Sequence, residues 1–290
     1  MIGGMHKVKR GAKLAIRAVV PMSVRKPLAA WLSRQQWLPD RNWWSVELVA
    51  DLADRDPVQY HTFLWTNHMG YAESYEIVER FGEERIHPSR RMLFADLVRF
   101  LERQGPSPEE VESVFEVGCS MGYLLRHMEE SLFPTASRLE GVDIDEYAIQ
   151  QGKDYLAELD SRVVIAAADM RDLETVLKNR LFDLTLCAGV LMYLTEEQAL
   201  PVVRTMLKHT NRWLILAGLA HPDRDNKDLD SSTVRESDGS FIHNMDDMVV
   251  RAGGRVVFRR WEGARDVHGN TIYFLFCSPD ADGTGQPQTC

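Results

Sequence analysis

The residues of this sequence that could do chemistry begin with two glycines and an aspartate. Gly118 and Gly122 lie in the run Gly-Cys-Ser-Met-Gly, directly after the apolar stretch 114–117. Glycine lets the backbone turn sharply and lets a ligand approach the main chain. Asp143 follows 21 residues after Gly122, at the end of the next apolar stretch, where a carboxylate can accept hydrogen bonds from ribose hydroxyls. This spacing predicts a site for a nucleoside-containing ligand.

Two further carboxylates strengthen this prediction. Glu116 stands inside the first apolar stretch, and a charge there is costly unless it has a partner. Asp169 follows the third apolar stretch in the same way that Asp143 follows the second. A glycine loop alone is weak evidence, whereas a loop with acids after two successive strands is much more specific. A nicotinamide site fits less well, because its loop normally reads GxGxxG.

These residues resemble the class I S-adenosylmethionine-dependent methyltransferases over roughly residues 111–278. The resemblance implies that Asp143 binds the ribose, that Ile144 lies against the adenine, and that Asp169 accepts from the adenine amino group. Ser120 departs from the family pattern, because many members have another glycine there. The resemblance implies S-adenosylmethionine as the cofactor and the binding residues Glu116, Gly118, Cys119, Ser120, Gly122, Asp143, Ile144, Asp169, Met170 and Ala188.

The stretch 187–193 bears on the methyl acceptor. It reads Cys-Ala-Gly-Val-Leu-Met-Tyr and so lacks the Asn/Asp-Pro-Pro-aromatic tetrad that, in this family, accompanies methylation of base amines or glutamine amides. It resembles the small-molecule branch instead. We therefore expect transfer to a small molecule, a sugar or a glycolipid, on oxygen. The alternatives are N-methylation of a small amine and a non-catalytic scaffold that binds the cofactor.

Two histidines are candidates for a catalytic base. His221 follows the fifth apolar stretch directly, and His243 precedes the last predicted helix. The alternative for His221, at least as well supported, is a histidine that caps a strand end. The acids of the loop 221–240 are typical of a solvated loop, so no metal site is expected. The residues predicted to line the substrate pocket are Tyr71, Tyr75, Met192 and Tyr193.

The elements that must position these residues alternate between strand and helix. Short apolar stretches at 114–117, 139–142, 163–167, 182–188 and 213–217 are separated by helical segments, and 256–261 and 271–276 follow without room for a helix between them. This pattern predicts an α/β, Rossmann-like, seven-stranded, mostly parallel sheet with an antiparallel last strand and an N-terminal helical extension. The predicted domains are a basic arm (1–41), a helical cap or lid (42–110), the methyltransferase domain (111–278) and a disordered tail (279–290).

Charge is distributed unevenly along the 290 residues. The formal net charge is −9, but residues 1–41 hold nine basic residues and one acid, a net charge of +8, and the remainder carries −17. The acidic body argues against nucleic acid as a partner. Four cysteines without metal-type or disulfide-type spacing suit a reducing, cytoplasmic compartment. No run of 18 uncharged apolar residues occurs, so we expect no spanning helix.

The basic arm is predicted to be helical and amphipathic. Residues 8–19 place apolar side chains on one face and basic ones on the other, and Pro21 ends this helix. Such a helix can pack on its own domain or on a second subunit, which would make a homodimer. It can also lie on an anionic membrane, placing the chain at the inner face of that membrane. The sequence leaves these alternatives open.

Overall fold

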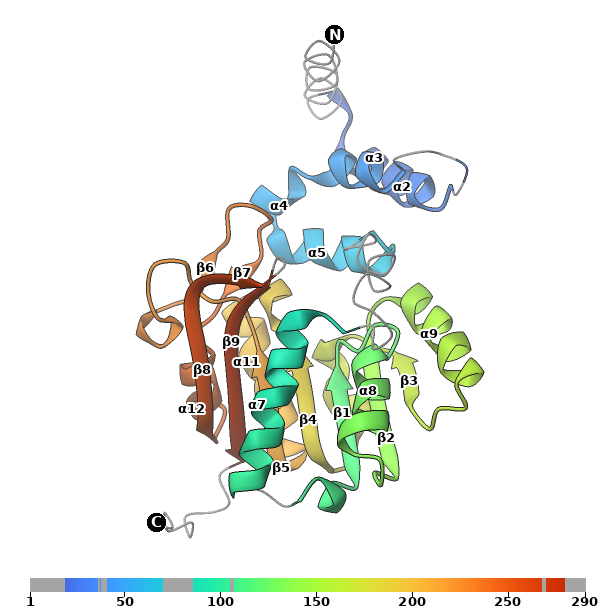
Figure 1. The fold of residues 1–290 in the computed structure, drawn as a ribbon. Helices are drawn as coiled ribbons and strands as arrows, with labels where there is room; N and C mark the ends of the chain where they lie inside the picture. Colours follow the sequence, from blue (N-terminus) through green and yellow to red (C-terminus); the bar gives the residue numbers. More distant parts are fainter. Residues whose placement is uncertain are drawn as a thin grey trace. The chain divides into compact units, whose positions relative to one another are not determined.

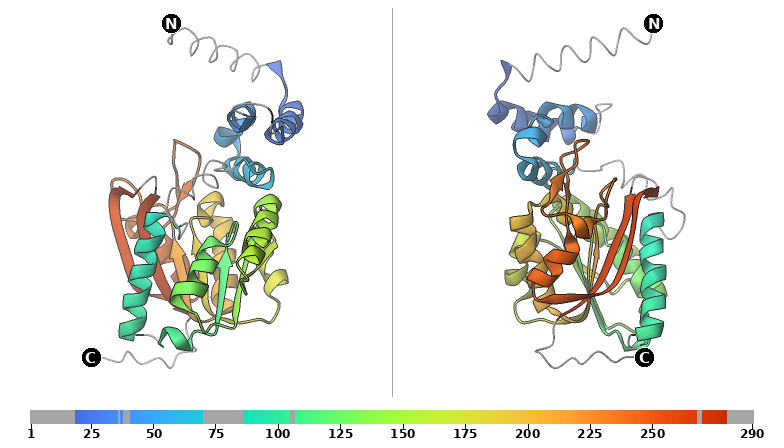
Figure 2. Two further views of the ribbon diagram at one scale, coloured as in Figure 1. Left: turned by 45° about the vertical axis from the view of Figure 1, so that its right-hand side comes forward. Right: turned by 90° about the vertical axis from the view of Figure 1, so that its left-hand side faces the viewer.

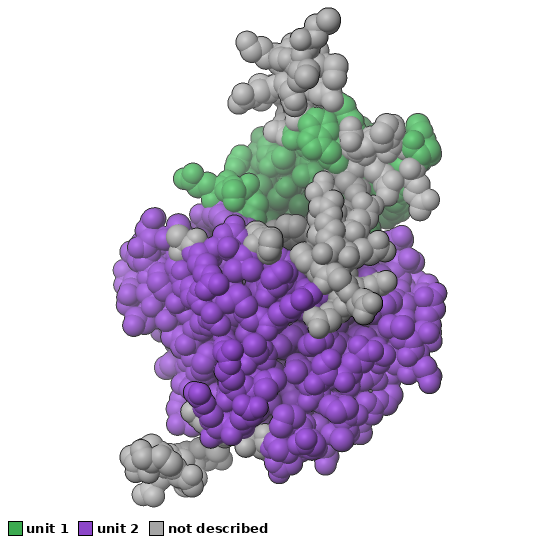
Figure 3. Space-filling view, in the orientation of Figure 1, with its two compact units in different colours: residues 1–76, 236–239 green, residues 77–235, 240–290 purple. Residues whose placement is uncertain are grey.

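The structure is a computed structural model that describes residues 19–35, 37, 41–69, 86–104, 107–267 and 270–279. The chain divides into two compact units, coloured separately in Figure 3. Unit 1 comprises residues 1–76 and 236–239, and unit 2 comprises residues 77–235 and 240–290. The predicted helix at 8–19, apart from its last residue, lies outside the described residues, and so do the pocket residues Tyr71 and Tyr75 and the tail after residue 279.

Unit 2 is built on a seven-stranded sheet with the order β3-β2-β1-β4-β5-β9-β8 (Figure 1). The first five strands in this order are parallel, and β9 runs antiparallel to both β5 and β8. The Rossmann-like prediction is therefore confirmed. The strands are β1 (Ser113–Val117), β2 (Arg138–Asp143), β3 (Val164–Ala167), β4 (Phe182–Ala188), β5 (Thr210–Ala217), β8 (Gly254–Val267) and β9 (Asn270–Pro279), with a separate pair β6 (Thr233–Val234) and β7 (Phe241–Ile242).

The central strand β1 explains why the sheet reads as apolar stretches. All five of its residues are buried, as expected for a parallel strand covered on both faces. Val114 pairs with Leu139 on β2 and with Leu184 on β4. The strand order reverses between β1 and β4, and in open α/β sheets ligands bind outside the carboxyl ends of the strands at this point.

Helices cover both faces of the sheet, with α7 and α8 on one side and α11 and α12 on the other (Figures 1 and 2). Asp145, Thr195 and Asn244 each cap the helix that follows them by accepting a backbone N–H. The helices of unit 2 are α7 (Pro88–Gln104), α8 (Tyr123–His127), α9 (Glu146–Glu158), α10 (Leu173–Leu177), α11 (Glu196–Lys208) and α12 (Met245–Arg251), with short turns η2 (Pro108–Glu110), η3 (Met128–Leu132), η4 (Met170–Asp172), η5 (Leu191–Tyr193) and η6 (Asn226–Asp228).

Helix α7 belongs with the sheet, although the sequence analysis placed its residues in the helical middle of the chain. Its apolar face joins the same buried core as Phe274 and Phe276 of β9. Phe100 stands edge-on to Phe276, with ring centroids 5.3 Å apart. The compact units therefore divide the chain near residue 76, whereas the sequence analysis set its boundaries at 41 and 110.

The last two strands form the expected hairpin, but both are longer than predicted. Strand β8 lies at the edge of the sheet, and its pairing with β9 shifts register between Val256 and Phe258 and again between Trp261 and Asp266. The loop 221–240 is also more ordered than expected. It contains η6 and strand β6, which pairs antiparallel with β7.

Unit 1 is a small helical body with its own core. Its described helices are α2 (Met22–Ser33), α3 (Arg41–Val49), α4 (Leu52–Arg55) and α5 (Pro57–Thr66). Ala29, Val49, Leu52 and Leu64 are buried together in this core. No helix in the described part of the chain is both long enough and apolar enough to cross a bilayer.

Candidate cofactor and acceptor site

The turn after β1 brings main chain and ligand space together. Gly118 has φ of 79° and Gly122 has φ of 83°, a region of backbone conformation that favours glycine. A side chain at Gly118 would also collide with Val190, because its Cβ would lie 2.3 Å from Val190 Cγ1. Both glycines are therefore required by the turn that opens α8.

Two of the three residues between these glycines, Cys119 and Ser120, serve different purposes. Ser120 also has a left-handed φ, 49°, which explains why a glycine is common at this position in the family that the sequence resembles. Its backbone N–H donates to Asp143 Oδ2 at 2.9 Å, while its buried Oγ has no hydrogen-bond partner. Cys119 is buried against Gly141. A Cβ added to Gly141 would lie only 2.7 Å from the Cβ of Cys119. Cys119 therefore packs the turn against β2.

Asp143 closes this turn from the end of β2. Its two carboxylate oxygens accept the N–H groups of Ser120 and of Asp145, each at 2.9 Å. Burial raises its pKa above the ordinary value, although the hydrogen bonds from Asp145 and Ser120 oppose this shift. Each carboxylate oxygen has a second lone pair, so the fixed side chain can still accept from a ligand hydroxyl.

Glu116 is the most unusual charge in the molecule. Its side chain is 1% exposed, and its Oε2 has no hydrogen-bond partner in the described structure. Burial raises its pKa to about 8, an effect that Arg90 opposes and that the nearby charge of Asp143 increases. A buried carboxyl with an unpartnered oxygen is what a site for a ligand cation requires.

Arg90 completes this charged cluster, and the sequence analysis missed it. It comes from the first turn of α7, and its Nη2 donates to the carbonyl of Ala188 at 3.1 Å. Its guanidinium lies against Gly189, where a Cβ would come within 2.7 Å of Nη2. Burial lowers its pKa, whereas Glu116 and Tyr193 act in the opposite direction. No local signal marked Arg90, because Ala188 and Gly189, which its guanidinium contacts, lie about a hundred residues further along the chain.

The adenine end predicted from the sequence lies at the ends of β2 and β3. Ile144 and Met170 are half-buried there. Asp169 accepts from the backbone N–H of Arg171 at 2.9 Å and also pairs with the guanidinium of Arg171. Burial alone would raise the pKa of Asp169, but the hydrogen bonds from Arg171 outweigh it and lower the pKa. Arg171 was also missed from the sequence.

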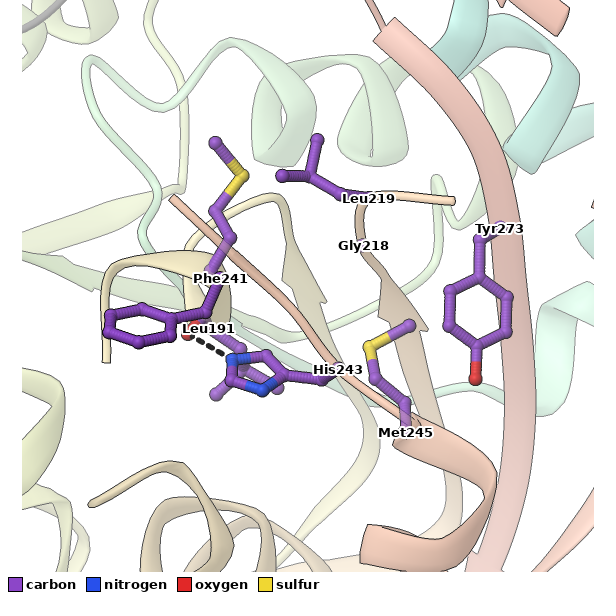
Figure 4. Close-up of a pocket in the computed structure, with 8 residues that line it drawn as sticks. Leu191, Gly218, Leu219, Phe241, His243, Met245 and Tyr273 are labelled. Atoms are coloured by element: carbon purple, nitrogen blue, oxygen red, sulfur yellow. Dashed lines mark hydrogen bonds between the residues drawn. The ribbon is translucent and has the colours of Figure 1, made fainter. Parts of the chain in front are cut away.

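A narrow pocket lies beyond the ends of β4 and β5 (Figure 4). It holds about 180 Å³ of space between atoms but is nowhere wide enough for a water molecule. Met245 folds over Gly218, where a Cβ would lie 2.9 Å from its Cε. Met192, predicted to line the substrate pocket, lies in this wall, while Tyr193 is buried beside it and outside the lining. The lining residues are Leu191, Met192, Gly218, Leu219, Phe241, His243, Met245 and Tyr273.

A single buried amide joins the walls of this pocket. Asn226 is 0% exposed, and its Oδ1 accepts from the His221 N–H and from Trp261 Nε1, both at 2.8 Å. Its Nδ2 donates to the carbonyls of Leu219 at 2.9 Å and of His243 at 2.7 Å. All four hydrogen-bonding positions of the amide are filled, so Asn226 fixes the β5 loop relative to the segment before α12.

His243 is held at both ring nitrogens. Its Nε2 lies 3.1 Å from the carbonyl of Leu191, and its Nδ1 lies 2.7 Å from Ser232 Oγ. A carbonyl only accepts, so Nε2 carries the proton in the neutral ring. Burial lowers its pKa, which favours the neutral form. In this arrangement neither nitrogen is offered to an acceptor molecule.

His221 is half-buried at the end of the strand that precedes it. Its Nδ1 accepts the backbone N–H of Asp223 at 3.1 Å, so in the neutral ring the proton lies on Nε2. This hydrogen bond would have to break before the ring could take a second proton at Nδ1. In the described residues no group of three or more His, Cys, Asp or Glu is arranged to hold a metal ion.

Comparison with known proteins agrees with this geometry. Residues 114–212 match the family described as a methyltransferase domain. No curated protein sequence matches the chain. Solved structures are similar in fold at low identity, and the family match runs from β1 through β4.

Three of these structures illustrate the likeness. Magnesium protoporphyrin IX methyltransferase (ChlM) from Synechocystis PCC 6803, with bound SAM, is 14% identical, covers 77% of this chain and 96% of its own, and has a TM-score of 0.52. The PH0226 protein from Pyrococcus horikoshii is 14% identical over 71% and 98% of the two chains, with a TM-score of 0.51. The CcbJ methyltransferase from Streptomyces caelestis is 12% identical over 71% and 96%, with a TM-score of 0.50.

The fold, the glycine turn with its carboxylates and the family match lead to one assignment. Residues 114–212 match a methyltransferase domain, and the sheet order of unit 2 agrees with the class I, S-adenosylmethionine-dependent type of that domain.

Proposed function

We propose that the chain transfers the methyl group of S-adenosylmethionine to an oxygen of a small acceptor that has an apolar body. The observation that carries this proposal is the buried Glu116, whose Oε2 has no partner at the carboxyl end of β1. The cofactor, when bound, supplies a methyl group already activated by its sulfonium. The chain's own residues then bind, orient and exclude water.

The charged residues of the site fit the methionine end of this cofactor. Glu116 suits its ammonium group, and Arg90 suits its carboxylate, because an arginine recognises a carboxylate with paired donors. Ser120 Oγ is buried without a partner and provides a further polar contact. Asp143 suits the ribose hydroxyls. Asp169 suits the adenine amino group, which would share the carboxylate oxygens of Asp169 with Arg171.

The pocket of Figure 4 supports an acceptor with an apolar body. Leucine, methionine and phenylalanine side chains make up most of its lining. Methionine is flexible and adapts to the shape of what it contacts, so Met245 can move off Gly218 when an acceptor enters. These walls favour a lipid-linked or aromatic part over a bare sugar.

The hydrogen bonds of the two histidines favour an acceptor that needs no protein base. Both His221 and His243 hold backbone groups through a ring nitrogen. An acceptor oxygen that is already ionised near neutral pH can attack the activated methyl directly. We therefore propose that these histidines hold the pocket walls. For His221 this is the capping alternative considered from the sequence.

His221→Ala tests this assignment. If His221 caps the loop, the variant keeps its turnover number within about tenfold of the parent chain. If His221 takes a proton from the acceptor, turnover falls by roughly 10²-fold or more, and the base assignment is restored. Turnover is measured as methyl transfer under saturating cofactor, and His221→Gln serves as the control for loss of ring volume.

Methyl transfer itself is tested with labelled S-adenosylmethionine. The intact chain is incubated with fractionated small-molecule, lipid and glycan extracts, and mass spectrometry identifies the methylated product and the atom modified. Transfer to an oxygen of an apolar small molecule supports the proposal. Transfer to nitrogen contradicts the choice of atom, and calorimetric cofactor binding without transfer to any extract favours the scaffold.

We also propose that the chain works at the inner face of an anionic membrane. Residues 1–41 carry a net charge of +8, and the acidic remainder of the chain does not require such an arm. An acceptor with a lipid part would be concentrated at that surface. A homodimer through the same residues is the competing expectation.

A further inference from the structure

The outward face of helix α2 in unit 1 is apolar, which is unusual for a helix on a protein surface. Val24, Leu28 and Trp31 lie one turn apart along α2, and their side chains are 53%, 41% and 53% exposed. The opposite side of the helix buries Arg25 and Ala29. The helix thus turns three large apolar side chains outward and a charged one inward, which departs from the usual amphipathic pattern, while Met22 packs against the core of unit 1.

Arg25 fixes this orientation. Its side chain is 2% exposed, and its Nε donates to the carbonyl of Val20 at 2.8 Å. Its Nη1 donates to the carbonyl of Leu48 at 2.8 Å, and Nη1 and Nη2 bind Asp51 Oδ1 and Oδ2 at 2.5 and 2.9 Å. Rotation of α2 to bury its apolar face would break this buried ion pair and leave a charge without a partner.

The net charge of the sequence segment that contains α2 indicates which kind of partner covers this face. Arg34 is exposed at the end of α2, and residues 1–41 carry a net charge of +8. A second copy of the chain would bring a second segment of the same charge to the contact, and the two would repel each other. An anionic surface would be attracted instead, and tryptophan is enriched where membranes meet water. Trp37, just after the helix, is 73% exposed.

We propose that Val24, Leu28 and Trp31, which we call the α2 face, bind the surface of a membrane that contains anionic phospholipids. The apolar side chains enter the boundary between headgroups and acyl chains, and the basic residues lie over the phosphates. This binding surface lies within unit 1 and does not depend on the acceptor chemistry proposed for unit 2. The inference rests on the membrane location proposed above for residues 1–41, and it names the three side chains that would make the contact.

The test uses the full chain with phosphatidylcholine vesicles that do or do not contain phosphatidylglycerol. We expect the chain to float with the anionic vesicles and not with the neutral ones. The double variant Leu28→Glu, Trp31→Glu should weaken this binding by about tenfold or more, since it removes two partly exposed apolar side chains and adds two negative charges. Val250→Glu, at a valine of unit 2 that is 64% exposed, is the matched control and should bind like the parent chain.

Calorimetric binding of S-adenosylmethionine by the double variant serves as the folding control. Unchanged vesicle binding by a folded double variant would overturn the proposal, as would a parent chain that binds no vesicles. A parent chain that is dimeric in solution, with a double variant that is monomeric, would assign the α2 face to a second copy and overturn the membrane assignment. A parent chain that binds anionic vesicles but transfers no methyl group would count against the proposed function and leave the α2 face supported.

Discussion

Single residues at the turn after β1 are held in states that the fold alone does not need. Ser120 has a φ of 49°, and a left-handed conformation costs a residue with a side chain about 1–2 kcal/mol. Glu116 is buried in the last, turn-facing part of β1, and its Oε2 has no hydrogen-bond partner among the described residues. Such energetic costs are usually retained where a bound ligand interacts with the strained or unpaired group, which is the role that we propose for S-adenosylmethionine here.

Cofactor binding should release a proton from Glu116 near pH 7. The pKa of Glu116 in the folded chain is about 8, so its carboxyl is mostly protonated at that pH. An ammonium group bound beside it favours the charged form and drives ionisation. Calorimetry in buffers with different ionisation enthalpies should show a release approaching about one proton, and Glu116→Gln should abolish it. A release that persists in the variant would assign the proton to another group.

The same residue should make stability depend on pH. The folded pKa of Glu116 lies above its ordinary value of 4.5, so the folded chain holds this proton more tightly than the unfolded chain does. The stability contribution is therefore complete below about pH 4.5 and is lost as the pH rises toward 8, at about 1.4 kcal/mol for each pKa unit. Urea unfolding of the chain and of Glu116→Gln should diverge over this range, with the variant the more stable at pH 8. Parallel curves would contradict the buried charge.

Which residues of the site could be predicted depends on how far away their partners lie in the sequence. Gly118, Gly122 and Asp143 were predicted because a turn and the strand after it are local features. Arg90 and Asn226 were missed because their roles exist only once the strands are ordered. An arginine on an amphipathic helix and an asparagine in a polar loop look the same in the sequence whether or not they end up buried.

At the scale of elements, helix α7 matters because it delivers Arg90 to the cofactor site. Arg90→Ala should weaken S-adenosylmethionine binding by about 1.5–3 kcal/mol, the contribution of a hydrogen bond to a charged group. Arg103→Ala, in the last turn of the same helix, controls for the loss of an arginine from α7. Isothermal calorimetry checks both variants, and equal affinities for the two would remove Arg90 from the site.

The loops beyond β5 are joined by Asn226, and this connection can be tested directly. Asn226→Asp replaces two N–H donors with an acceptor and buries a charge, so it should lower the free energy of unfolding by about 3 kcal/mol or more. Asn211→Asp, at an exposed asparagine of β5, should change it by less than about 0.5 kcal/mol. Chemical denaturation measures both changes. Similar stabilities for the two variants would show that the amide does not hold these loops.

The alternation of strand and helix was predicted well, because strands buried on both faces are continuous apolar stretches. The lengths of β8 and β9 were underestimated, since β8 extends through charged residues and β9 extends into Ser278 and Pro279, which do not continue an apolar stretch. The short β6–β7 ladder was missed because its strands have only two residues each, too few for any period to show.

At the scale of the whole molecule, each compact unit has its own core, and we expect each to lose structure by itself. Arg25→Met leaves Asp51 without its buried partner and should destabilise unit 1 by roughly 3–5 kcal/mol. Hydrogen exchange should then accelerate in residues 19–35 and 41–69, while the strands of unit 2 keep their protection. Arg34→Met, on the same helix but exposed, is the control. Faster exchange throughout both units would show that their stabilities are linked.

The edges of the sheet have a consequence for assembly and aggregation. Strand β3 at one edge has four residues, and β8 at the other carries Arg255, Arg259, Arg260 and Arg265 along a strand with two register shifts. Short, charged or irregular edge strands are poor templates for an added strand. Continuous sheets across two copies of this chain are therefore disfavoured, and crowded or concentrated samples should resist fibril formation.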